Sequence, residues 1–122
     1  MITVGVLTPH AAAGPDAEFP LIAPEFVRVQ VSRIQMPASS RASEGGPPAT
    51  LEELRALATP EALDQAASAL PPGSFHVLVW ASTSSAYVIG YDAESALLER
   101  LRARWAVRAC ATSASAVSAL RS

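Results

Sequence analysis

WASTSSAYVIG, residues 80–90, directly follows the apolar stretch FHVLV and places four hydroxyl side chains in a row after it. The apolar run has the length of a buried strand, and a helical pattern follows at residues 92–104. Hydroxyl groups at the end of such a strand have two common uses. They cap the helix that follows, or they join the free N–H groups of the turn in holding a small anion. The sequence leaves both uses open.

Apolar runs and helical patterns alternate along the rest of the chain. We expect strands at residues 2–8, 26–34, 75–81 and 106–111. We expect helices opened by Pro15, by Thr50 and again by Thr59, at residues 92–104, and at residues 113–120. This alternation predicts one α/β domain over residues 1–122, a three-layer sandwich with a mainly parallel four-stranded sheet. Residues 37–48, rich in Ser, Gly and Pro, are expected to form a flexible loop.

Ligands of parallel sheets bind beyond the carboxyl ends of the strands. Three of the four expected strands end in hydroxyl or turn residues, which makes this edge the candidate site. The residues predicted to line it are Pro9, His10, Ser82, Thr83, Ser84, Tyr87, Thr112 and Ser113. His10 is either an acid–base group or a solvated loop residue.

Composition excludes several classes of function. The net charge of −2 offers no attraction to nucleic acid or an anionic membrane. The chain has no lysine for Schiff-base chemistry, no Gly-rich phosphate loop, and too few His and Cys residues for a zinc site. No apolar run reaches the roughly 18 residues of a membrane span, and the first residues do not resemble a signal peptide. A lone cysteine, Cys110, fits a reducing cytoplasm; it is either a buried inert thiol or, beside a helix terminus, a thiolate nucleophile.

The segments VGVLTPHAAAGPDAEFP, ASTSSAYVIG and CATSASAVSAL together resemble the Asp/Glu racemase superfamily. The most similar branch holds maleate cis-trans isomerase and arylmalonate decarboxylase. The resemblance implies an enzyme of two similar α/β halves with the active site between them. It further implies that a cysteine moves a proton at the carbon next to a carboxylate, and that no metal or organic cofactor takes part. The expected substrates are small dicarboxylates or arylmalonates.

Carried over by position, the resemblance places Ser82 where racemases and isomerases have their first catalytic cysteine and the decarboxylase has glycine. Thr83 and Ser84 match the Thr-Ser pair that donates to substrate oxygens, and Pro9 matches a proline at the end of the first strand. His10 begins a loop that is more similar to that of the decarboxylase than to that of the isomerases.

Thr112 and Ser113 match the hydroxyls of the last turn. Two departures affect the expected activity. Ser82 does not supply a thiolate, and Cys110 does not match the second cysteine, which belongs to the half that would follow Ser122. We therefore expect a homodimer, or a complementary second half, to complete the site. The alternative is a catalytically inactive carboxylate-binding module or a degenerate fragment.

Overall fold

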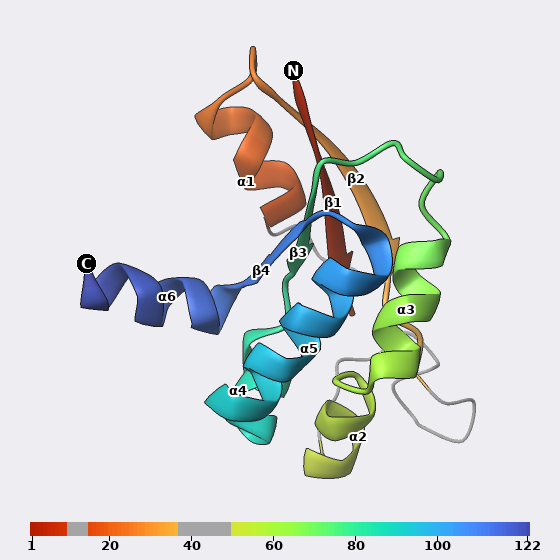
Figure 1. Ribbon diagram of the computed structural model, residues 1–122, viewed down its shortest axis with the longest axis vertical. Helices are drawn as coiled ribbons and strands as arrows, with labels where there is room; N and C mark the ends of the chain where they lie inside the picture. The colour runs from red at the N-terminus through yellow and green to blue at the C-terminus, as the bar shows by residue number, and fades with distance from the viewer. Residues whose placement is uncertain (10–14, 37–49) are drawn as a thin grey trace.

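The computed structural model describes residues 1–9, 15–36 and 50–122, which form an α/β domain around a four-stranded sheet (Figure 1). All the strand pairs are parallel, in the order β2-β1-β3-β4. The strands are β1 (Ile2–Thr8), β2 (Val27–Arg33), β3 (Val77–Trp80) and β4 (Arg108–Ala111). The predicted α/β class and parallel sheet are therefore confirmed, and each strand lies within the range expected for it.

The described helices are α1 (Pro15–Ile22), α2 (Leu51–Ala56), α3 (Pro60–Ser68), α4 (Thr83–Ile89), α5 (Tyr91–Trp105) and α6 (Thr112–Arg121). Helix α4 was not predicted, because the sequence pattern indicates a turn between the strand that ends at residue 81 and the helix at residues 92–104. Helices α4 and α5 are divided at Gly90, whose φ of 87° lies in the left-handed region. A residue with a side chain adopts that conformation rarely, so glycine suits this break.

The three layers follow from the alternation of side chains along the strands. Val4, Val6 and Val79 belong to one apolar cluster, against which Phe19 of α1 packs. Leu7, Leu78 and the other alternate residues belong to a larger cluster with α3 and α5. The sheet is thus covered by α1 on one face and by α3 and α5 on the other, as Figure 1 shows.

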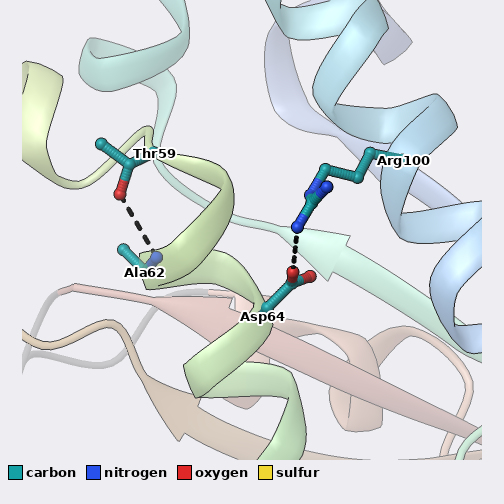
Figure 2. Close-up of polar contacts among 4 residues, drawn as sticks. All are labelled: Thr59, Ala62, Asp64 and Arg100. Carbon is teal, nitrogen blue, oxygen red and sulfur yellow. Dashed lines mark hydrogen bonds and ion pairs between the residues drawn. The ribbon is translucent and has the colours of Figure 1, made fainter.

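The predicted helix starts at Thr50 and Thr59 are confirmed by their hydrogen bonds. The Thr50 hydroxyl accepts from the N–H of Glu53 at 3.1 Å, and the Thr59 hydroxyl accepts from the N–H of Ala62 at 3.2 Å. Figure 2 shows the second of these caps. It also shows the ion pair of 2.7 Å between Arg100 and Asp64, which connects α5 to α3.

Two of the expectations fall outside this description. His10 and the loop expected at residues 37–48 lie outside the described residues. Within the described ranges, no helix combines the length and the apolar character needed to cross a lipid bilayer.

Candidate functional site at the carboxyl edge of the sheet

The candidate site begins where the chain order of the sheet reverses. From β1 the sheet continues to β2 on one side and to β3 on the other, and such a switch point is where open α/β sheets bind ligands. Leu7 pairs with Trp80, and the N–H of Ala81 donates to the carbonyl of Leu7 at 2.8 Å. Pro9 and Ser82 therefore follow neighbouring strands at the same edge.

Two of the predicted hydroxyls meet directly at this edge. The Thr83 Oγ1 and Thr112 Oγ1 atoms lie 2.7 Å apart, and either one can be the donor. The contact forms because Trp80 of β3 pairs with Ala111 of β4, so that the two strands end level with each other. Thr83 opens α4 and Thr112 opens α6, and the hydrogen bond joins the first turns of these helices.

Ser82 does not use its side chain as a helix cap. It occupies the N-cap position of α4 and is only 2% exposed, yet its hydroxyl makes no capping hydrogen bond. Helix α6 likewise starts without a side-chain cap, because its N-cap residue is Ala111. The capping interpretation therefore fails at Ser82, the first hydroxyl of the quoted stretch.

The remaining predicted residues take different positions around the Thr83–Thr112 pair. Ser84 is exposed beside Thr83, and Ser113 is half-buried beside Thr112. Tyr87 is 85% exposed and lies one helical turn after Thr83, so both residues share a face of α4. Pro9 is half-buried at the end of β1.

The neighbouring Ser85 was not among the predicted site residues. Its side chain is fully buried, and its Oγ has no hydrogen-bond partner among the described residues. An unpaired buried hydroxyl is costly, so the hydroxyl-rich turn places an unsatisfied polar group in the interior.

Glu94 of α5 is a second polar residue of this region that the sequence reasoning missed. It is 1% exposed, and its Oε2 atom has no partner in the described part of the chain. Burial raises the pKa of this carboxyl, and a hydrogen bond from the backbone of Ala114, in the first turn of α6, partly opposes the shift. A signal for Glu94 was present, since it occupies the apolar stripe of α5 that continues through Leu97, Leu98 and Leu101.

Cys110 lies on the other face of the sheet from the neighbouring alanines of β4. It packs against the cluster that contains Val79 and Ala81, whereas Ala109 and Ala111 belong to the larger cluster. Burial raises the pKa of the Cys110 thiol, while a hydrogen bond with Ser115 and the charge of Arg102 lower it by less. This favours the inert thiol over the thiolate nucleophile.

The Cys110 side chain lines a cavity of about 400 Å³ between α5 and α6. Arg102, which also lines it, already donates to Glu99 at 2.6 Å and to the Ala109 carbonyl at 2.8 Å. Both hydrogen bonds are made within the protein, so the Arg102 guanidinium connects α5 to β4 and is not set aside for a ligand of this cavity.

The arrangement offers neutral hydrogen-bond donors and one buried carboxyl group. Among the described residues, no group of three or more His, Cys, Asp or Glu side chains is placed to hold a metal ion. Hydroxyl donors at the ends of parallel strands suit a carboxylate or an oxyanion. No protein-family model, curated protein or solved structure matches the chain.

Proposed function

We propose that the chain binds a small carboxylate at the carboxyl edge of its sheet, with the Thr83–Thr112 hydroxyl pair as the central donor. The observation that carries this proposal is the 2.7 Å contact between these two hydroxyls, which come from the turns after two neighbouring strands. Ser82, whose hydroxyl makes no capping hydrogen bond, lies directly before Thr83. Hydrogen bonds between neutral hydroxyls and a charged acceptor are stronger than those between neutral groups.

The reaction that we propose for this site is cofactor-free proton transfer at the carbon next to the carboxylate. Its support is the resemblance to the maleate isomerase and arylmalonate decarboxylase branch, together with neutral donors suited to an enediolate. The thiol that moves the proton would come from a second copy of the chain or from a complementary half, because Ser82 replaces the first cysteine. The substrates would be small dicarboxylates or arylmalonates.

A second candidate is a binding module for small carboxylates without catalysis. The raised pKa of Cys110 favours this alternative, since it leaves the chain's own site without a thiolate. The two candidates share the ligand and differ in turnover.

Calorimetric titration with malonate and maleate tests the binding that both candidates require. We expect Thr83→Ala/Ser84→Ala to weaken binding by roughly tenfold or more, because each hydrogen bond to a charged group contributes about 1.5–3 kcal/mol. The control is Thr50→Ala/Ser68→Ala, which removes the exposed N-cap hydroxyl of α2 and an exposed hydroxyl at the end of α3. Equal affinity of both double variants and the unmodified chain would contradict the proposed site.

Light scattering with and without malonate, followed by turnover assays with maleate and an arylmalonate, separates the two candidates. A dimer that malonate tightens, together with turnover, supports the enzyme. Binding to a monomer without turnover supports the binding module.

A further inference from the structure

Glu94 and the Thr83–Thr112 pair are connected through the first turn of α6. Thr112 is the first residue of this helix, and Ala114, two residues later, provides the backbone hydrogen bond to the Glu94 carboxyl group. The Glu94 side chain is 1% exposed, and its Oε2 has no partner within the described ranges. A buried acidic group is therefore directed at the helix terminus that carries one of the two ligand-binding hydroxyls.

A carboxylate bound at Thr112 would bring a second acidic group to this one helical turn. Two carboxylates that share a site do not ionise independently, because their like charges raise the pKa of one of them. The helix N-terminus stabilises negative charge, but only by the equivalent of about half a unit charge. Water screens Glu94 poorly because its side chain is buried.

We propose that binding of a carboxylate at the Thr83–Thr112 pair is coupled to the uptake of one proton by Glu94. The inference rests on the proposed function, since it concerns the same ligand. The proton comes from solvent and binds Oε2, the oxygen without a partner. Glu94 is then neutral, and the bound ligand provides the negative charge at the α6 terminus.

The other ionisable groups on the neighbouring elements do not replace Glu94 in this role. On α3, Asp64 is paired with Arg100, and on α6 the Arg121 guanidinium lies over the Tyr91 ring at 5.6 Å. Tyr87 on α4 and Arg108 on β4 are exposed. The Cys110 thiol of β4 hydrogen-bonds with Ser115 in the first turn of α6, but burial raises its pKa, so it stays neutral over this pH range. The pKa of Glu94 is already raised by its own burial, which lowers the cost of protonation.

The test is calorimetric titration of the full chain with malonate from pH 5 to pH 8, in two buffers with different ionisation enthalpies. The difference in heat between the buffers counts the protons taken up for each malonate bound. We expect up to one proton, and an affinity that falls by up to about tenfold per pH unit above the pKa of Glu94 in the free protein.

Glu94→Gln is the matched variant, because the amide oxygen can still accept the Ala114 hydrogen bond while the side chain stays neutral. Malonate itself titrates in this range, but it does so equally in both proteins, so their difference isolates Glu94. We expect the variant to lose the extra proton and to bind several times more tightly at pH 8. Asp92→Asn, an exposed substitution on the same helix, should behave as the unmodified chain.

The outcomes separate the two proposals. Binding with equal proton uptake in the unmodified chain and in Glu94→Gln would overturn the coupling and leave the proposed function standing. No binding at any pH would overturn both. If the variant does not fold, trifluoroacetate replaces malonate with the unmodified chain, because its carboxylate stays ionised throughout. Binding of trifluoroacetate without proton uptake would then overturn the coupling.

Discussion

The hydrogen bond between Thr83 and Thr112 should couple the stability of α4 and α6. Thr83→Val and Thr112→Val each remove the hydroxyl and keep the branched shape of the side chain. A hydrogen bond of this kind contributes about 0.5–1.5 kcal/mol to the free energy of unfolding. We expect the lower half of this range because Thr83 is exposed and Thr112 half-buried. Each single variant should thus lose roughly 0.5–1 kcal/mol, which lowers the melting temperature by about 2–5 °C in a domain of this size.

The double variant should lose little more than either single variant. Once one hydroxyl is gone, the other has no partner in the pair, so its removal costs less. Urea unfolding of the unmodified chain, both single variants and the double variant gives the coupling energy directly. We expect about 0.5–1 kcal/mol of coupling. Additivity within about 0.3 kcal/mol would show that the two hydroxyls do not stabilise the fold through each other, and would refute the reasoning.

Hydrogen exchange locates the effect on the chain. No residue of α6 is buried, and the helix extends away from the sheet towards the C-terminus (Figure 1). The attachment of α6 to the rest of the domain therefore depends on contacts near its ends. Local unfolding of α6 should need less free energy than local unfolding of the core. We expect Thr112→Val to speed exchange in the first turns of α6 by up to about fivefold for a loss of 1 kcal/mol. Exchange in α3, which packs on the other side of α5, should not change.

Two further predictions concern ionisable groups. The folded-state pKa of Glu94 is raised by burial, so the native protein binds this proton more tightly than the unfolded chain does. The stabilisation from this proton is full below the ordinary pKa of a glutamate and is lost as the pH rises through the folded-state pKa. The melting temperature of the unmodified chain should therefore fall across this pH window. It should fall less in Glu94→Gln, which has no carboxyl group to titrate. A steeper or equal fall in the variant would contradict the assignment. Burial also raises the pKa of the Cys110 thiol, so alkylation by iodoacetamide should be slow at pH 7 and should accelerate well above that pH. Cys110→Ala should leave the affinity for malonate unchanged. Rapid alkylation at pH 7 would instead support Cys110 as a thiolate nucleophile.

The fold could be predicted because each strand is marked by its own residues. The β-branched run at the start of the chain, the alternating pattern before Ile34 and the FHVLVW run each indicate a strand without reference to the others. The alternation with helical patterns then restricts the sheet to a parallel one. Helix α4 was not predicted because it is short and its AYVI segment is apolar, a pattern that fits the end of a strand or a turn equally well.

From the sequence, the candidate site could be predicted only as the carboxyl edge of the sheet, without the contacts between its side chains. The sequence indicates which residues follow each strand, but the contact between Thr83 and Thr112 depends on two strands being neighbours and ending level. Neither strand order nor register is encoded in the local pattern of either turn. Glu94 was missed for a different reason. Its place in the apolar stripe of α5 was visible, but an acidic residue in the first turn of a helix is already accounted for by its favourable interaction with the helix dipole.

The Thr83–Thr112 contact also bears on how the site would present itself to a ligand. In a hydroxyl pair one oxygen accepts and the other donates, so the accepting threonine keeps its own hydrogen free. Accepting a hydrogen bond polarises that O–H group and makes it a stronger donor towards a third atom. The pair therefore works as one strengthened donor, whichever threonine accepts. It follows that Thr83→Val or Thr112→Val alone should leave a single weaker donor, and that malonate affinity should fall in both variants by a similar factor. If only one of the two variants loses affinity, the other hydroxyl serves the attachment of α6 and has no part in the binding of the ligand.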